Sequence, residues 1–559
     1  MEDGEPTNSP LLPPPAQPTL KRRQRCAAAF GLLSVLGLTA AVVCPLLVQR
    51  ELHGRLDDEF LVDSESRPGF ADWADTATNS VREVHMYVFA IDNADEFVTK
   101  KQRLRVREHG PFVFRKRQRK VDVRFNINAD VVDYRLWTET VFDSERTHNL
   151  TMGKYSTDNV SFRVVDSFFW GQPPKTGMVL WRALNQWSND TMRMFTTKTV
   201  AELKNGYGVC PLCYPGLMPN EKQPPSHTYR TRIGRKDMSA AASYVRWRGM
   251  ERLDVQCPWG NTTLGFQFCP ESSCCGGFTP PWGTPPENTI HEKGDPFEPN
   301  QVAGTDGNQF APSKRRWWTP LALTHASHLV VFVDFIWRHL PVTLVPNVPL
   351  EVYGLRLGRY HVDVNSSSSD NATTFPYNRA YHMDGPRAVI NCTLVQQGAP
   401  IFFSNPHFLG AGRGATDRIE GLQPDPAKHA TVFGIEPNSG RNVYSRQRMQ
   451  VNVKVEAVTF DDNVTWFGHM MPGQTYAPLA WFDIVETITP AKAAQLRKGL
   501  QQANFLWTGS LIAGLSISVA AAVLAIALAR RRVDRGGRAK KEQLPSRTQA
   551  ACVPTQSDM

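Results

Sequence analysis

Two long uncharged apolar segments, one near each end of this 559-residue chain, constrain its fold more than any other feature. The first runs from Cys26 to Val48 and the second from Leu506 to Ala529. Each exceeds the length of about 20 apolar residues that a helix needs to cross a hydrocarbon core about 30 Å thick. We therefore predict two membrane-spanning helices that enclose one large domain, residues 49–505.

Basic residues flank both apolar segments on the sides that face the chain ends. They are Lys21, Arg22, Arg23 and Arg25 before the first segment, and Arg530, Arg531, Arg532, Arg535 and Arg538 after the second. Because such residues are retained on the cytosolic side, we expect both tails, 1–25 and 530–559, in the cytosol. The first segment is longer than the apolar part of a signal peptide, and no clean A-x-A site follows it, which favours an uncleaved anchor.

The net charge of +10 would by itself be compatible with a nucleic-acid-binding protein. More than half of it lies in the two tails, beside the apolar segments, where anionic lipid headgroups explain it better. We expect no nucleic-acid partner. The middle is long enough to bury a substantial core, as one large unit or as two domains.

Eight N-x-S/T sequons lie between the apolar segments and none lies in either tail. They begin at Asn149, Asn159, Asn189, Asn261, Asn365, Asn371, Asn391 and Asn463. Sequons are glycosylated only in the secretory pathway, so this placement favours an exoplasmic glycoprotein domain.

Seven cysteines lie in the same middle region, namely Cys210, Cys213, Cys257, Cys269, Cys274, Cys275 and Cys392. In an oxidising compartment they are disulfide candidates, and an odd number leaves one thiol free or paired between chains. Cys210 and Cys213 could also be half of a zinc site or a redox pair, but no matching C-x-x-C or H-x₃-H follows. Cys26, at the cytosolic membrane boundary, is a candidate for palmitoylation and equally for a plain membrane-buried thiol.

The middle reads mainly as antiparallel β structure. Residues 121–128 and 449–457 alternate apolar and polar side chains, the period of a half-buried strand, and 84–91, 112–114 and 350–357 resemble further strands. Residues 191–205 have helical spacing and end at Gly206, whereas Thr489 and Pro490 predict the start of a helix that continues into the second apolar segment. The Pro-, Gly- and Cys-rich stretch 210–312 predicts long loops.

No signature of a common enzyme class is present, neither G-x-S-x-G, H-E-x-x-H nor a P-loop. Gly410, Gly412 and Gly414 form a glycine-rich stretch without the strand and helix that a nucleotide site requires, so we interpret it as a flexible turn. His325 and His328 lack a third ligand and are interpreted as structural. We predict neither enzymatic activity, nor a cofactor, nor a metal.

An ordered set of short motifs resembles the class B scavenger receptor family. The most specific is the run 391–409, with Asn391-Cys392-Thr393, Gly398-Ala399-Pro400 and Ser404-Asn405-Pro406-His407-Phe408-Leu409. Further motif segments occur in the same order as in the family. They are 70–73, 108–115, 199–207 and 304–312 before this run, and 421–424, His429, 436–440 and 446–453 after it. The resemblance covers nearly the whole chain. Several cysteines usual in the family are missing here, so its disulfide pairing cannot be transferred, and the chain resembles a divergent member.

The resemblance implies a class α+β fold, with a β-barrel-like exoplasmic domain topped by a helix bundle and anchored at both ends. The apical helical region would correspond to about 151–207, followed by a Cys/Pro/Gly-rich insertion at about 208–300. Ligand-binding candidates in the apical region combine aromatic rings with lysines, which suits an acyl chain with an anionic head: Phe168, Phe169, Trp170, Lys175, Trp181, Lys198 and Lys204. The alternative reading makes these aromatic residues the packing core of the bundle.

The function implied is a receptor that binds lipids or lipoprotein-like particles and moves lipid through an apolar conduit toward the membrane. Fatty acids, sterols, sterol esters and phospholipids are the expected ligands, and we expect part of the strands at 121–127 and 449–457 to line the conduit. The alternative is a sorting receptor that carries a lumenal hydrolase to lysosome-like compartments, for which Leu11-Leu12 offers an incomplete dileucine signal. Plasma membrane and endosomal or lysosomal membrane both remain open, as does a homo-oligomeric state.

Overall fold

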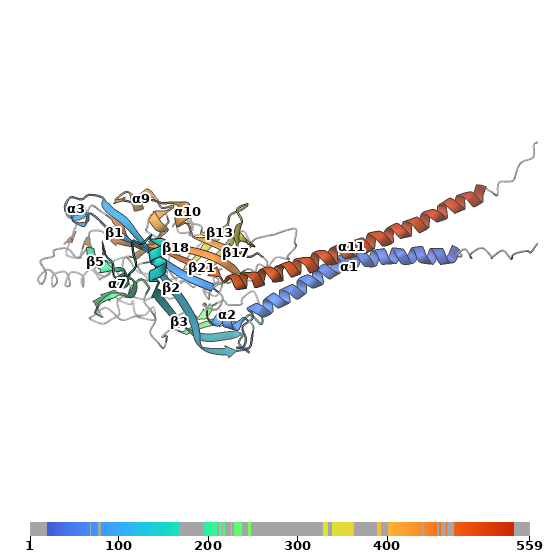
Figure 1. The fold of residues 1–559 in the computed structure, drawn as a ribbon, viewed down its shortest axis with the longest axis horizontal. Coiled ribbons are helices and arrows are strands. Elements are labelled where there is room, and N and C mark those ends of the chain that lie inside the picture. Colours follow the sequence, from blue (N-terminus) through green and yellow to red (C-terminus); the bar gives the residue numbers. More distant parts are fainter. Residues whose placement is uncertain are drawn as a thin grey trace, which may run out of the picture. The chain divides into compact units, whose positions relative to one another are not determined.

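The computed structural model describes residues 20–67, 69–75, 80–166, 195–209, 212–214, 216–218, 225, 228–236, 244–246, 328–333, 338–362, 388–392, 401–437, 441–455, 458–459, 465–466 and 474–541. The chain divides into two compact units (Figure 1). The helical unit comprises residues up to 54 and from 498 onward, and the sheet unit comprises residues 55–497. Each is described by itself below.

Two long helices contain the predicted apolar segments. α1 (Leu20–Phe60) and α11 (Pro490–Lys541) each hold a stretch long and apolar enough to cross a membrane, at Ala28–Val48 and within Pro490–Leu528. The predicted start of α11 is confirmed, because Thr489 accepts hydrogen bonds from Lys492 N at its hydroxyl (3.3 Å) and from Ala493 N at its carbonyl (2.9 Å).

Small residues let α1 and α11 approach closely within the helical unit. A Cβ atom on Gly37 would lie 2.8 Å from the backbone nitrogen of Ser518, and the buried residues Ala41 and Gly514 lie on the same two helix faces. Ser34 and Ser518 donate hydrogen bonds to each other's carbonyl oxygens at 3.0 and 2.9 Å. Such small-residue contacts with reciprocal serine hydrogen bonds are typical of helices that pair inside a bilayer.

The sheet unit is built around one large, mainly antiparallel sheet of fifteen strands among the described residues. Its path runs β10-β11-β13-β17-β18-β21-β1-β2-β3-β8-β9, with β12, β14, β15 and β16 attached beside it. β16 pairs with β2 in parallel, whereas the other pairings are antiparallel. The class α+β and the antiparallel sheet are therefore confirmed. In the part of the chain that the structure describes, the sheet does not close into a barrel.

The strands of this sheet are β1 (Ser80–Ile91), β2 (Leu104–Asn126), β3 (Val131–Phe142), β8 (Thr228–Arg232), β9 (Tyr244–Arg246), β10 (His328–Val333), β11 (Arg338–Leu344), β12 (Leu350–Val352), β13 (Leu355–Val362), β14 (Val389–Asn391), β15 (Ile401–Ser404), β16 (Ile419–Glu420), β17 (Val432–Ile435), β18 (Asn442–Val455) and β21 (Thr475–Ile488). Short two-stranded pieces are β4 (Ser161–Val165) with β5 (Phe195–Thr199), β6 (Tyr207–Val209) with β7 (Leu212–Tyr214), and β19 (Val458–Thr459) with β20 (Thr465–Trp466). The short helices are α2 (Phe70–Ala74), α3 (Ala94–Thr99), α4 (Ser144–Leu150), α7 (Val200–Asn205), η7 (Pro406–Phe408), α9 (Arg413–Thr416) and α10 (Pro426–His429).

The strands predicted at 84–91, 112–114, 121–128 and 449–457 are confirmed within β1, β2 and β18, whose ends differ by a few residues. The single strand predicted at 350–357 is wrong. Tyr353 and Gly354 both take positive φ, 49° and 73°, and fold this segment into the hairpin β12–β13. A two-residue turn of this kind matches the twist of the flanking strands.

The helix predicted at 191–205 is only partly correct. Residues Phe195–Thr199 form β5, which pairs with β4, and the helix begins only at Val200. Thr199 accepts a hydrogen bond from Glu202 N (3.1 Å), and the Glu202 carboxylate accepts one from Thr199 N (2.8 Å), a capping box that fixes this boundary. Gly206 ends the helix with φ 101°, as predicted. Residues 167–194 of the expected apical bundle lie outside the described part.

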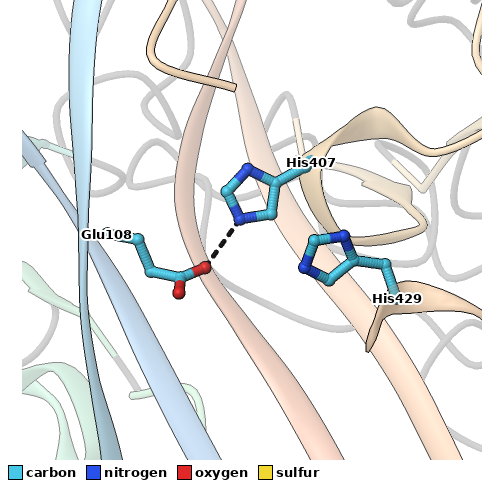
Figure 2. A group of neighbouring side chains, drawn as sticks. All are labelled: Glu108, His407 and His429. Carbon is cyan, nitrogen blue, oxygen red and sulfur yellow. Dashed lines mark hydrogen bonds and ion pairs between the residues drawn. The ribbon is translucent and has the colours of Figure 1, made fainter. Parts of the chain in front are cut away.

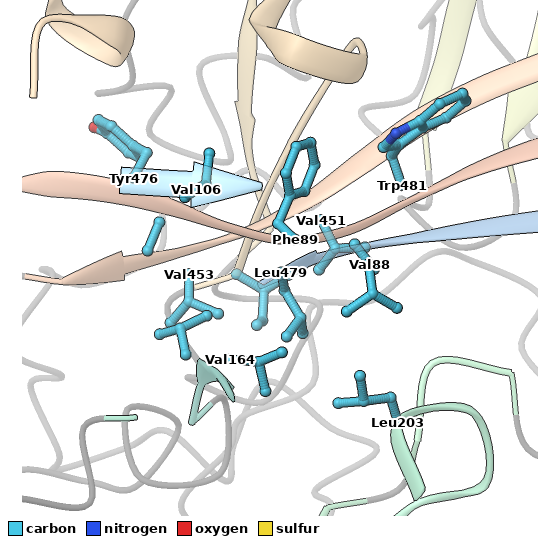
Figure 3. Packing of buried hydrophobic residues seen from close by; sticks show 14 of the residues in the cluster. Val88, Phe89, Val106, Val164, Leu203, Val451, Val453, Tyr476, Leu479 and Trp481 are labelled. Carbon is cyan, nitrogen blue, oxygen red and sulfur yellow. The ribbon is translucent and has the colours of Figure 1, made fainter. Parts of the chain in front are cut away.

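The hydrophobic core lies against β1, β18 and β21 (Figure 3). Val88, Phe89, Val453 and Leu479 have no exposed surface, and Leu203 of α7 packs into the same cluster. Burying each such side chain stabilises the fold by about 1.5–3 kcal/mol relative to leaving it in water. The core therefore fixes β1, β18 and β21 as one rigid platform for the groups described next.

Candidate functional site

Three ionisable side chains from distant parts of the chain meet beside the central strands (Figure 2). Glu108 comes from β2, His407 from η7 and His429 from α10. One ligand-type atom from each lies within 4.8 Å of the others. Both histidines are buried, whereas the Glu108 side chain is 33% exposed. Among the three, Glu108 is therefore the member that offers exposed surface.

Backbone conformation around His407 is unusual and is held by buried amides. His407 and Phe408 have φ values of 52° and 57°, a left-handed region that costs non-glycine residues about 1–3 kcal/mol each. His407 N donates to Gln450 Oε1 (2.7 Å), whose amide donates to Asn452 Oδ1 (2.7 Å). Asn452 in turn donates to the carbonyl of Phe402 at 3.2 Å. This chain of amides holds η7 on strand β18.

Two ring N–H groups converge on the same oxygen of Glu108. His407 Nε2 and Trp481 Nε1 each lie 2.6 Å from Glu108 Oε2. Burial opposes ionisation of this carboxyl, but the hydrogen bonds from His407 and Trp481 outweigh it and hold the pKa of Glu108 below its ordinary value. Glu108 therefore acts as an ionised acceptor.

The tautomers of both histidines follow from their backbone partners. Gln423 N donates to His407 Nδ1 at 3.0 Å, and Asp425 N donates to His429 Nδ1 at 2.9 Å. A ring nitrogen that accepts a hydrogen bond carries no proton, so in each neutral ring the proton is on Nε2.

This donor arrangement does not fit a metal ion. A metal at Nε2 needs that nitrogen's lone pair, and the proton then moves to Nδ1, where it would oppose the N–H of Gln423 or Asp425. Glu108 Oε2 is also already engaged by two N–H donors. The cluster is a hydrogen-bonded carboxylate beside two histidine rings whose Nδ1 atoms accept backbone hydrogen bonds.

Aromatic rings extend the cluster into a continuous row. Tyr87 stacks on Trp481 (centroids 3.9 Å apart, planes parallel), and Trp481 meets His429 edge-on at 5.5 Å. His429 stacks on His407 at 4.5 Å, and His407 meets Phe89 edge-on at 5.2 Å. Burial, and secondarily the neighbouring His407, lowers the pKa of His429 to about 4.

A buried ionic group of one acid and two arginines contacts α10 through hydrogen bonds. Asp483 is 1% exposed and pairs with both Arg446 and Arg448. Arg448 also donates to the carbonyl oxygens of Ala427 (3.3 Å) and Ala430 (2.6 Å). The guanidinium of Arg448 therefore both neutralises Asp483 of β21 and caps the carbonyl groups at the end of α10.

Two of the seven predicted ligand-binding residues lie in the described part, and the structure does not bring them to this cluster. Lys198 of β5 pairs with Glu202 (3.3 Å) and lies 4.2 Å above the ring of Tyr207. Lys204 of α7 is 3% exposed, donates to Asn205 Oδ1 (2.8 Å), and burial lowers its pKa. Phe168, Phe169, Trp170, Lys175 and Trp181 lie outside the described residues.

The predicted modification sites are described in part. Asn149 and Asn159 are exposed, as glycosylation requires, and Asn391 lies in β14. Cys213 lies in β7, Cys392 is fully buried, and Cys26 lies in α1. Asn189, Asn261, Asn365, Asn371, Asn463, Cys210, Cys257, Cys269, Cys274 and Cys275 lie outside the described residues.

The sequence analysis did not identify Glu108, His407 and His429 as a group. All three stand in the motif segments quoted above, which was the available signal, but Glu108 and His407 are 299 positions apart. The pairings of β2 with β1, of β1 with β21 and of β21 with β18 bring their elements together, as does the pairing of β16 with β2.

Comparisons with known proteins agree with the motif resemblance. A family model described as the CD36 family matches residues 29–529. Scavenger receptor class B member 1 of Cricetulus griseus is 23% identical over 470 residues, covering 81% of this chain and 79% of that protein. Lysosome membrane protein 2 of Homo sapiens is 24% identical over 453 residues, covering 77% of this chain and 81% of that protein.

Proposed function

This chain belongs to the CD36 family and is a membrane protein of the scavenger receptor type, and on that premise we propose that it binds lipids or lipoprotein-like particles and transfers lipid toward the membrane. Fatty acids, sterols or their esters, and phospholipids are the ligands that suit it. The observation that carries the proposal is the extent of the family match, which spans both apolar helices and nearly all of the chain between them.

An apolar route through the sheet unit would solve a physical problem of lipid uptake. Each hydrated methylene costs about 0.8 kcal/mol, so a long acyl chain resists crossing water by more than about 10 kcal/mol. Val451, Val453 and Val455 of β18 lie in the packed core, and Val123 and Phe125 at the end of β2 pack against Leu61, Val132 and Ile233. The proposed route therefore runs beside these packed clusters and not through them.

Capture would occur in the apical region that contains Phe168, Phe169, Trp170, Lys175 and Trp181. Lys198, at the edge of that region, retains a partly exposed ammonium group that could attract an anionic headgroup. Lys204 is better explained as a packing residue of α7, since its side chain is buried.

Uptake by cells that lack endogenous receptors tests the proposal. Cells producing the wild-type chain should take up a fluorescent fatty acid or sterol ester faster than mock cells. Lys175→Glu should reduce capture, more so at low salt, whereas Lys236→Glu, an exposed change next to the turn between β2 and β3, should not. Equal uptake by wild-type and mock cells would contradict the proposed function.

Both tails are proposed to face the cytosol, with the sheet unit exoplasmic. Protease added to intact cells should then degrade the middle and spare tags on either end. Asn149→Gln and Asn159→Gln, both at exposed positions, should each remove one glycan from the apparent mass. A protected middle, or a mass unchanged by glycosidase, would contradict this topology.

A second candidate function is sorting of a lumenal hydrolase to lysosome-like compartments. The similarity to lysosome membrane protein 2 and the Leu11-Leu12 pair favour it. Steady-state location in acidic vesicles, lost in Leu11→Ala/Leu12→Ala, together with a co-purifying hydrolase and no lipid uptake, would favour it over lipid transfer.

A further inference from the structure

The segment Ile419–Ala430, called the strap below, lies across the central strands and is fastened at several points. Its first residues, Ile419 and Glu420, pair in parallel with Leu104 and Arg105 of β2. Gly421 then passes so close to β2 that a Cβ atom would lie 2.1 Å from the carbonyl oxygen of Val106. This end of the strap is fixed by backbone contacts that do not depend on pH.

The rest of the strap is fastened through the two histidines. Gln423 N and Asp425 N donate to Nδ1 of His407 and His429. These amides flank Pro424, which has no N–H of its own. Arg448 adds the carbonyl contacts at Ala427 and Ala430. Two of the fastening bonds therefore require unprotonated ring nitrogens.

Protonation would reverse the sense of these bonds. An imidazolium ring has an N–H at both nitrogens and no acceptor. At His429, a proton on Nδ1 would face the N–H of Asp425, so the acceptor would be lost and two donors would oppose each other. The bond between Gln423 and His407 has the same weakness.

The charged groups around His429 come from every element packed against it. Arg448 of β18 opposes a positive charge on His429, as His407 of η7 does whenever it is protonated, whereas Glu108 of β2 and Asp425 of the strap favour one. Burial, the largest influence, also opposes it and holds the pKa of His429 near 4, against an ordinary value of 6.5. The ring of His407 stacks on His429, and Trp481 meets it edge-on.

From this geometry we propose that the strap is an acid-released latch, fastened while His407 and His429 are neutral and freed from its Gln423–Ala430 end when His429 takes up a proton. The inference does not rest on the lipid-transfer function. Release of the strap would change the structure of the sheet unit when the protein moves from neutral pH to an acidic compartment.

The direction of the pH dependence of strap release follows from the pKa of His429 in the fastened and released states. A released ring titrates near 6.5 and a fastened ring near 4, so the fastened state is fully favoured above pH 6.5 and loses its advantage as pH falls toward 4. Between about pH 7 and about pH 5 the opening equilibrium should rise about 20-fold, as those two values require.

Hydrogen exchange of the full chain in lipid nanodiscs tests the latch. A peptide covering 421–426 reports on Gln423 and Asp425, because Pro424 and Pro426 carry no amide hydrogen. After correction for intrinsic exchange rates, protection in the wild type should fall about 20-fold from about pH 7 to about pH 5. In His429→Asn, the Oδ1 atom can accept from Asp425 N but cannot be protonated, so protection should persist at both pH values.

His148→Asn is the matched control, because His148 is exposed on α4 and should leave the wild-type pH response unchanged. Unchanged protection in the wild type would overturn the latch. So would an equal loss of protection in wild type and His429→Asn, since another group would then be responsible. If His429→Asn is not recovered from cells, the wild type and the His148→Asn control still decide between retained and lost protection.

Discussion

Gly514 lies directly against the backbone of Ala41, since a Cβ atom on Gly514 would fall 2.6 Å from the Cα atom of Ala41. About two turns from Ala41 along α1, and about one turn from Gly514 along α11, the hydroxyl oxygens of Ser34 and Ser518 are 3.3 Å apart. The two helices therefore pair through backbone proximity, which only small residues permit.

Gly514→Leu should separate this helix pair, because the larger side chain cannot occupy the space next to Ala41. In a Ser34→Cys/Ser518→Cys background, oxidation should join the helices within one chain, and Gly514→Leu should abolish that cross-link. Gly509→Leu is the control, since no atom lies within 4 Å of a Cβ atom there. Equal cross-linking in both leucine variants would contradict the observed pairing.

Asp483→Asn should destabilise the sheet unit by about 3–5 kcal/mol, because it leaves the buried guanidinium of Arg448 without its acid. Asp95→Asn, which removes an exposed pair with Arg163, should cost less than about 1 kcal/mol. Urea unfolding of the full chain in detergent, followed by tryptophan fluorescence, measures both. Similar costs for the two variants would show that the Asp483 group contributes no more than a surface pair.

Trp481→Phe should cost about 1.5–3 kcal/mol, because it removes an N–H donor from the ionised Glu108 while keeping an aromatic ring. Tyr87→Phe also keeps its ring, which stacks on Trp481, and should cost less. Thermal unfolding of the two variants gives the comparison. If both shift the midpoint equally, ring packing and not the hydrogen bond accounts for the effect.

Lys204→Met should leave folding and lipid capture nearly unchanged, because methionine preserves the buried apolar stem and the lost hydrogen bond to Asn205 contributes only about 0.5–1.5 kcal/mol. Lys204→Glu should instead retain the chain in the endoplasmic reticulum, since it buries a carboxylate beside α7. Cell-surface labelling and uptake distinguish the two. A loss of capture in a well-folded Lys204→Met variant would assign this lysine to the ligand after all.

Local pattern was sufficient to predict much of the fold. Alternation predicted the end of β2 and the end of β18, and Thr489 with Pro490 predicted the start of α11 because capping depends on adjacent residues. It misplaced Phe195–Thr199, whose helical spacing was overridden by pairing with β4. At Tyr353-Gly354 a two-residue turn divided a stretch that resembled one strand.

The candidate site could not be predicted in the same way. His407 and His429 are held by backbone amides of the strap, and Glu108 by two rings from other elements. None of these bonds is local in the sequence except that of His429 with Asp425. Glu108, His407 and His429 all lie in motif segments of the family. Their proximity, however, depends on the order of the strands in the sheet.

The neighbouring positions of β1 and β21 have a mechanical consequence. The first residue of β1, Ser80, pairs with the last residue of β21, Ile488, and α11 begins two residues later. The pairing of Ser80 with Ile488 thus brings together the two ends of the chain segment that forms the sheet. A force that draws the two membrane segments apart would load the ion pair between Asp72 of α2 and Lys492 of α11, and after it the rung of Ser80 and Ile488 in the middle of the sheet. Lateral tension in the bilayer would thus act on the centre of the fold before it reached either edge.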